Sequence, residues 1–257
     1  MKYLNDVYCK DCVGKVCKSK SSGDFKLLKY NDSKNVEIQF LKTRFETVAT
    51  LDNIRNGKVK DPYLPSVYGV GIVGNKYLIS EGCRGTKEYV LWKDVLRRCY
   101  SDDFKKKQPT YKACEVSDKF KSYEYFYEWC HSKIGFGVDG FEIDKDLLIK
   151  GNKVYSEDSC VFLPAEINMV LVKCTASRGE HLIGVSWHNT KKAFVARVRK
   201  SKGKQEHLGY FKTEIETFNA YKQAKEAFIK EQANKFKSQI DDRAYNALMN
   251  YTVNIDD

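Results

Sequence analysis

Apolar and polar positions alternate most regularly near the C-terminal end of the chain. Residues 194–199 alternate strictly, and this pattern predicts a strand with one face on a core and the other in water. Residues 183–187 and 205–211 predict two further strands, and 189–190 and 201–204 have the composition of turns. These segments predict a three-stranded antiparallel sheet.

A helix is predicted directly after the third strand. Thr213 and Glu216 fit a capping box, in which a hydroxyl accepts from a free backbone N–H and the carboxylate reaches back. The apolar positions that repeat at helical spacing are Ile215, Phe218, Tyr221, Ala224 and Phe228. One helix packed across three strands is the simplest fold for this pattern.

The alternation also predicts which strand residues face away from the helix. Phe194, Ala196 and Val198 suit the helix stripe, so Val195, Arg197 and Arg199 face the other way. Gln205 and His207 share one face of the third strand, and Ser186 and His188 share one face of the first. Polar and cationic side chains therefore gather on the open face of the predicted sheet.

The rest of the chain predicts an α+β protein of several modules. Residues 1–75 form a small β module with strands expected at 24–30, 36–41 and 45–51. The expected modules are a β module (1–75), a helical and then irregular central module (76–177), the three-stranded-sheet domain (178–237) and an acidic tail helix (238–257). In the central module and the tail, apolar residues repeat at helical spacing, which indicates helices that each pack one face against a core.

Net charge distinguishes the segment that contains the predicted C-terminal sheet from the rest of the chain. The whole chain has a formal net charge of +11, and residues 178–237 alone hold 14 basic and 6 acidic residues, a net +8. The central module is nearly neutral, at +1, and the tail is at −3. A positive charge focused on one segment is the electrostatic footprint expected of a nucleic-acid-binding domain.

Composition excludes several other classes. Aromatic residues make up 13% of the chain, enough for a packed core rather than wholesale disorder. No stretch approaches the roughly 18 apolar residues of a membrane helix, and the first residues lack the plan of a signal peptide. We therefore expect a cytoplasmic protein without a membrane partner, whose nine cysteines are reduced thiols.

Residues 182–237 resemble the ethylene-response-factor (Apetala-two type) DNA-binding domain. The residues that carry the resemblance are Gly184-Val185-Ser186-Trp187, Phe194–Arg199, His207-Leu208-Gly209-Tyr210-Phe211 and Ala220–Ala224. The resemblance implies a sheet in the major groove of double-stranded DNA. It assigns base contacts to Ser186, His188, Arg197, Arg199, Gln205 and His207, and Lys191 and Lys192 in a turn are expected on phosphates.

Residues 89–171 resemble a segment of phage and mobile-element HNH endonucleases. The carrying residues are Trp92, Arg98-Cys99-Tyr100, Pro109-Thr110-Tyr111, Cys114, Asp144-Lys145-Asp146, Lys150–Ser156, Cys160-Val161-Phe162, Pro164 and Ile167-Asn168. The resemblance implies phosphodiester hydrolysis with Mg²⁺ or another divalent cation. It assigns catalytic or metal-side roles to Asp144, Asp146, Asn152 and Asn168, with Asp144 and Asn168 as metal ligands.

The chain departs from the HNH pattern at the general base. Lys145 stands where that family has a histidine, and His131, the only histidine of residues 76–177, lies upstream of the motif. The alternative is that Asp144, Asp146 and Asn152 only shape turns, in a non-catalytic DNA-binding regulator or an inhibitor of a host protein. The expected function is thus sequence-preferring DNA binding, with a homing-type endonuclease as the enzymatic hypothesis and an inactive scaffold as the other.

A zinc site is the remaining metal hypothesis. Cys9, Cys12 and Cys17 supply three thiols, whereas a structural zinc site normally needs four ligands. No second Cys-x-x-Cys pair or histidine follows within the module. We therefore expect no zinc at this position.

Overall fold

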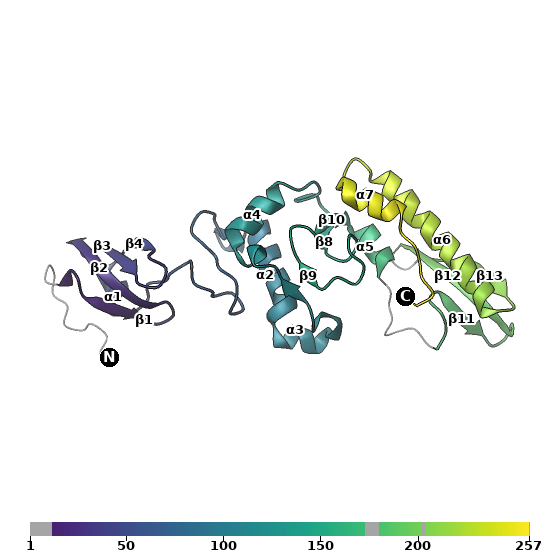
Figure 1. Cartoon of the computed structure of the whole chain (residues 1–257), viewed down its shortest axis with the longest axis horizontal. Coiled ribbons are helices and arrows are strands. Elements are labelled where there is room, and N and C mark those ends of the chain that lie inside the picture. Colours follow the sequence, from purple (N-terminus) through teal and green to yellow (C-terminus); the bar gives the residue numbers. More distant parts are fainter. Residues whose placement is uncertain (1–11, 173–179, 202–203, 257) are drawn as a thin grey trace. The chain divides into compact units, whose positions relative to one another are not determined.

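The computed structural model describes residues 12–172, 180–201 and 204–256 (Figure 1). The chain divides into two compact units, one of residues 1–109 and 118–127 and the other of 110–117 and 128–257. Helices and strands are both abundant, and the described strands form five separate sheets. The predicted α+β class is confirmed.

The first unit begins with a four-stranded antiparallel sheet whose strands follow one another in chain order. Its elements are β1 (Val16–Ser19), β2 (Gly23–Asp32), β3 (Asn35–Phe40), β4 (Glu46–Ala49) and α1 (Leu51–Arg55). The strand expected at 45–51 ends early because the Thr50 side chain accepts from the Asn53 backbone N–H and starts α1. Phe25, Ile38 and Phe40 are fully buried and form the centre of its core.

The remainder of the first unit is helical, as its stripes predict. Its elements are β5 (Ser80–Glu81), β6 (Arg84–Gly85), α2 (Lys87–Tyr100), α3 (Asp102–Lys107), a 3₁₀ turn at Lys119–Lys121 and the first part of α4 (Tyr123–His131). Trp92, Val95, Leu96 and Cys99 are all buried on α2. The indole N–H of Trp92 donates to the Phe120 carbonyl at 2.8 Å, so this ring is buried without an unpaired polar atom.

The second unit holds both candidate sites. Its elements are a 3₁₀ turn at Pro109–Tyr111, β7 (Glu115–Val116), β8 (Phe141–Asp144), β9 (Val154–Tyr155), β10 (Val161–Pro164), α5 (Ala165–Leu171), β11 (Val185–His188), β12 (Ala193–Ser201), β13 (Lys204–Phe211), α6 (Glu214–Lys235) and α7 (Asp242–Met249). β7 pairs in parallel with β9, and β8 pairs antiparallel with β10. β11, β12 and β13 form the predicted three-stranded antiparallel sheet.

Helix α6 belongs to two hydrophobic cores. Near its start, Phe218 and Tyr221 pack with Ala196 and Val198 of β12. Farther along, α6 packs against β10, α5 and α7 (Figure 1). The second core contains Val161, Leu163, Ile167, Val170, Phe228, Ile229, Ala233, Ile240, Ala244 and Leu248. The hairpin β8–β10 and the C-terminal sheet are thus joined through one helix.

The predicted capping box and most of the α6 stripe are confirmed. The Thr213 hydroxyl accepts from the Glu216 N–H, and the Glu216 carboxylate accepts from the Thr213 N–H, both at 3.2 Å. Ile215 was expected in the stripe but is 51% exposed. It stands in the first turn of α6, ahead of Phe218, where the helix first reaches the sheet core.

The chain after α7 returns along α6 (Figure 1). Val253 is buried in the core between the sheet and α6. The Lys222 ammonium donates to its carbonyl at 2.6 Å, and its N–H donates to the Glu226 carboxylate at 2.8 Å. The acidic tail is therefore part of the C-terminal fold, as the apolar spacing of its helix predicts.

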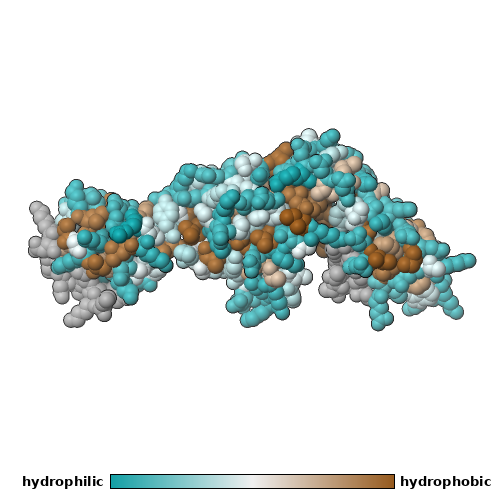
Figure 2. All heavy atoms as spheres, in the orientation of Figure 1, coloured by the Kyte–Doolittle hydropathy of each residue, from teal (hydrophilic) through white to brown (hydrophobic). Residues whose placement is uncertain are grey.

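Most of the visible surface is hydrophilic (Figure 2). Within the described ranges, none of the helices combines the length and the apolar character that a bilayer crossing requires.

Candidate nucleic-acid interface and candidate metal site

The strand register places the predicted base-contacting residues on one face of the C-terminal sheet. Arg197 of β12 lies opposite His207 of β13, and Arg199 lies opposite Gln205. Cross-strand partners share a face, and residues two apart along a strand share it too. The side chains brought together in this way are Ser186, His188, Arg197, Arg199, Gln205 and His207. We call this set, together with Tyr210, the reading face.

The two arginines of the reading face are available to a partner. Both are exposed, and neither forms an ion pair or a side-chain hydrogen bond with another residue of the described segments. Lys200, the next residue of β12, points to the other face and pairs with Glu206 at 2.6 Å. The hydrogen bond that the Lys200 ammonium donates to the Glu206 carboxylate raises the pKa of Lys200. Arg199 and Lys200 are thus neighbours on β12, but only the charge of Lys200 is compensated by a carboxylate.

Val195 departs from the expected pattern. It was predicted on the open face with the arginines, but it is only 1% exposed. Its cross-strand neighbours are Ser186 and Tyr210. The His188 ring on β11 and the Tyr210 ring on β13 approach to 5.3 Å between centroids. Because these rings meet across β12, they lie over Val195 and cover it.

Tyr210 belongs to the reading face although simple alternation from His207 excludes it. The register shifts by one residue between Ala196 and Arg197, which leaves Leu208 as the extra residue of β13. Gly209 adopts a φ of +139°, a backbone conformation that favours glycine. The bulge turns Tyr210 to the side of Gln205 and His207. A Gly inside a strand pattern was the only sequence signal for it.

The turn between β11 and β12 carries the two lysines expected on phosphates. Lys191 and Lys192 are both exposed, and Lys192 has a φ of +47°, a left-handed conformation within the tight turn. The Lys191 backbone N–H donates to Nδ1 of His188 at 3.2 Å. This bond fixes the His188 ring relative to the turn.

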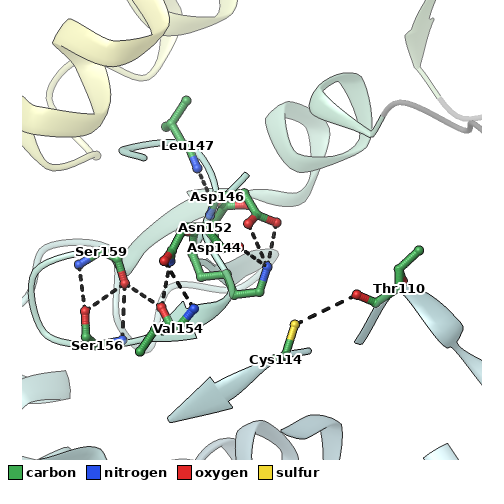
Figure 3. A network of polar contacts seen from close by, with 10 residues as sticks. Thr110, Cys114, Asp144, Asp146, Leu147, Asn152, Val154, Ser156 and Ser159 are labelled. Carbon is green, nitrogen blue, oxygen red and sulfur yellow. Dashed lines mark hydrogen bonds and ion pairs between the residues drawn. The ribbon is translucent and has the colours of Figure 1, made fainter. Parts of the chain in front are cut away.

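The hairpin of β8 and β10 carries the second candidate site (Figure 3). Asp144 is the last residue of β8, and its Oδ1 accepts from the backbone N–H groups of Asp146 and Leu147 at 2.9 and 2.7 Å. Burial raises the pKa of the Asp144 carboxyl, while these two N–H donors oppose the rise. Asp144 therefore starts the turn that leaves the strand.

Lys145 is the centre of the polar network in this loop. Its ammonium donates to both carboxylate oxygens of Asp146 at 2.7 Å and to the Asn152 carbonyl at 3.2 Å. The ammonium also lies 5.9 and 5.6 Å from the ring centroids of Tyr111 and Tyr155. The Lys145 side chain is 7% exposed. A general base needs a free lone pair, and this nitrogen is instead engaged as a donor.

Asn152 ties the same loop together. Its amide NH₂ donates to the carbonyls of Lys145 and Val154 at 2.8 and 2.7 Å, and its Oδ1 accepts from the Val154 N–H at 3.1 Å. The side chain therefore satisfies the backbone of a loop that has few ladder bonds of its own.

Asn168 has different partners. It lies on α5, and its NH₂ donates to the Glu142 carboxylate on β8 at 3.1 Å. Its Oδ1 is buried without a hydrogen-bond partner in the described part of the chain. The structure thus gathers Asp144, Asp146 and Asn152 around Lys145, whereas Asn168 is bound to Glu142.

These contacts bear on whether the loop fits a divalent cation. The Asp146 carboxylate is directed at the Lys145 ammonium, and Oδ1 of Asp144 and of Asn152 each accept from backbone N–H groups. Oxygens engaged in this way are not a set of open ligands for Mg²⁺. The described segments also contain no group of three or more His, Cys, Asp or Glu side chains placed to hold a metal. Asp146 and the Oδ1 atoms of Asp144 and Asn152 are therefore not arranged as Mg²⁺ ligands, and a divalent cofactor stays a prediction.

The cysteine cluster of the zinc hypothesis lies only partly within the described residues, because Cys9 falls outside them. Cys12 and Cys17 are both buried in the core of the N-terminal sheet. Burial, together with the neighbouring Cys12, raises the pKa of the Cys17 thiol to about 11. Metal ligation needs the thiolate, which this environment disfavours.

Comparison of the chain with protein-family models, with curated proteins and with solved structures finds no match.

Proposed function

We propose that this protein binds double-stranded DNA with sequence preference, through the reading face of β11, β12 and β13. The observation that carries the proposal is the cross-strand register, which sets Arg197 beside His207 and Arg199 beside Gln205 on an exposed face. Arginine donates two hydrogen bonds to guanine O6 and N7, and glutamine pairs with adenine N6 and N7 in the major groove. A two- or three-stranded sheet can enter that groove.

Charge supports the same proposal. Residues 178–237 carry a net +8, and Lys191 and Lys192 flank the reading face in an exposed turn. Lysines at a turn can neutralise phosphates and set the register of the sheet on the duplex. The resemblance to the ethylene-response-factor domain leads to the same partner. We also propose that the protein acts in the cytoplasm of a bacterial host.

The test is DNA binding by fluorescence anisotropy with the full chain and a duplex selected from a random library. Arg197→Ala and Arg199→Ala should each weaken binding by about 1–3 kcal/mol if they contact bases. Lys200→Ala is the matched control, because Lys200 lies on the same strand, faces the other way and is already paired with Glu206. Affinity should also fall steeply with salt as counterions are released. Equal effects of all three variants, with binding insensitive to salt, would refute the proposal.

The order of elements around the β8–β10 hairpin favours a second candidate function, that of a homing-type HNH endonuclease. Asp144 ends β8, β8 pairs antiparallel with β10, and α5 begins directly after β10. The HNH resemblance implies an acidic residue at such a hairpin. The contacts of Lys145, however, favour the non-catalytic alternative, a DNA-binding regulator built on the same hairpin.

Nicking assays separate these two candidates. The full chain is incubated with its selected duplex and Mg²⁺, Mn²⁺ or a chelator. Metal-dependent nicks that disappear in Asp144→Ala support the endonuclease. Tight binding without nicks in each metal supports the regulator.

A further inference from the structure

Three aromatic rings meet at one end of the reading face. Tyr210 is 45% exposed and lies between two histidines, with ring centroids 5.3 Å from His188 and 4.7 Å from His207. The three side chains come from the two outer strands of the sheet. Together they make an aromatic surface beside the arginines, and Val195 is buried beneath it.

One of these rings has a defined hydrogen-bonding direction. Because Nδ1 of His188 accepts from the Lys191 N–H, the proton of the neutral ring resides on Nε2. His188 thus offers a donor at Nε2, while Tyr210 contributes an apolar ring edge and a hydroxyl. The aromatic end differs in chemistry from the Arg197 and Arg199 end.

Residue positions along β12 give the distance between the aromatic end and the arginine end of the reading face. Val195, beneath the rings, precedes Arg197 by two residues and Arg199 by four. Two residues of a strand span about 6.6 Å, close to two base-pair steps of about 3.4 Å. A strand that lies along the major groove would therefore set the aromatic end about two base pairs from the Arg197 contact.

We infer, on the basis of the proposed function, that Tyr210 with His188 and His207 selects a thymine through its C5-methyl group. That methyl is the apolar feature of the major groove, and it is recognised by apolar contact. The thymine lies about two base pairs from the guanine contacted by Arg197. The 4-oxo group beside the methyl is an acceptor, which suits the Nε2–H of His188.

The experiment replaces thymine by uracil, which lacks only the methyl group. A binding site is first selected from a random duplex library with the full chain, and each thymine is then exchanged singly for deoxyuridine. One exchange should weaken wild-type binding about fourfold, the value of one buried methyl group. Tyr210→Ala should lose the same factor and show no further response to the exchange. Tyr210→Phe keeps the ring and should retain the discrimination.

Controls and outcomes separate this inference from the proposed function. Ile215→Ala, an exposed apolar residue of α6 away from the reading face, should discriminate as the wild type does. If no uracil exchange matters, or if Tyr210→Ala still discriminates, the thymine contact is wrong. If Arg197→Ala nevertheless weakens binding in that case, the proposed function stands. If neither arginine matters either, both proposals fail.

Discussion

Replacing Lys145 by methionine tests whether the buried ammonium organises the loop between β8 and β10. Methionine keeps most of the apolar stem and removes the charge. The change deletes the donor that serves both Asp146 oxygens and the Asn152 carbonyl, and it removes the cation from beside Tyr111 and Tyr155.

The size of the effect follows from the exposure of the two partners. Removing one member of a fully buried ion pair costs about 3–5 kcal/mol, because the other charge is left without compensation. Asp146 is 53% exposed and can regain water, so most of that penalty does not apply. Hydrogen bonds to charged groups contribute about 1.5–3 kcal/mol. We therefore expect Lys145→Met to lower the free energy of unfolding by about 2 kcal/mol.

Urea unfolding measures this, followed by tryptophan fluorescence in a Trp92→Phe background, where the signal comes from Trp129 and Trp187 of the second unit. Lys153→Met is the matched control, because Lys153 is an exposed lysine of the same loop. It should change stability by less than about 0.5 kcal/mol. Equal losses in the two variants would show that the Lys145 ammonium has no net stabilising role. Coupling to Asp146→Ala in a double-mutant cycle would then be near zero as well.

Three further changes have defined outcomes. Asp144→Asn keeps the acceptor for the Asp146 and Leu147 N–H groups. The raised pKa of Asp144 means that the folded state holds its proton more tightly than the unfolded state. Ionisation of Asp144 therefore lowers the free energy of unfolding as pH rises above about 3.9, the pKa of this carboxyl in the unfolded state. The Asn variant lacks this ionisation, so it should lose less stability than the wild type between acid and neutral pH. Urea titrations at a series of pH values measure the difference. Gly184→Ala should disrupt the sheet domain, because a Cβ there would lie 2.1 Å from the Tyr221 ring and the backbone φ is +76°. Loss of the near-ultraviolet circular dichroism of the second unit would show the disruption. A melting curve identical to that of the wild type would contradict it. Val253→Ala should lower the free energy of unfolding by roughly 1.5–3 kcal/mol through lost burial, whereas Ile255→Ala, at a more exposed position, serves as its control in the same assay.

The C-terminal sheet was predictable because its central strand alternates strictly and turn residues flank that strand. Alternation in 194–199 and the capping box at Thr213 specify the strands and the helix start from local sequence alone. Tyr210 was missed because a bulge at Gly209 reverses the parity of β13 after His207. A bulge depends on the pairing partner, which a single strand does not reveal.

The loop between β8 and β10 was predictable only in part. Its composition indicates turns, and Asp144 and Asn152 do shape the backbone there. The position of Lys145 was not foreseeable, because one of the two rings that flank it, Tyr111, comes from a turn distant in sequence, and the other, Tyr155, is placed by the pairing of β9 with β7. Long-range packing of this kind leaves no periodic signal.

The shared core gives the β8–β10 hairpin a role that needs no catalysis. The first part of α6 covers the C-terminal sheet through Phe218 and Tyr221. The rest of the helix extends past the sheet core and buries Phe228, Ile229 and Ala233 against β10, α5 and α7. Without the hairpin and α5, this half of α6 would expose a contiguous apolar surface, a liability for a free helix. The hairpin therefore supports the helix on which the reading face rests, and the Lys145 network holds the loop that connects its two strands.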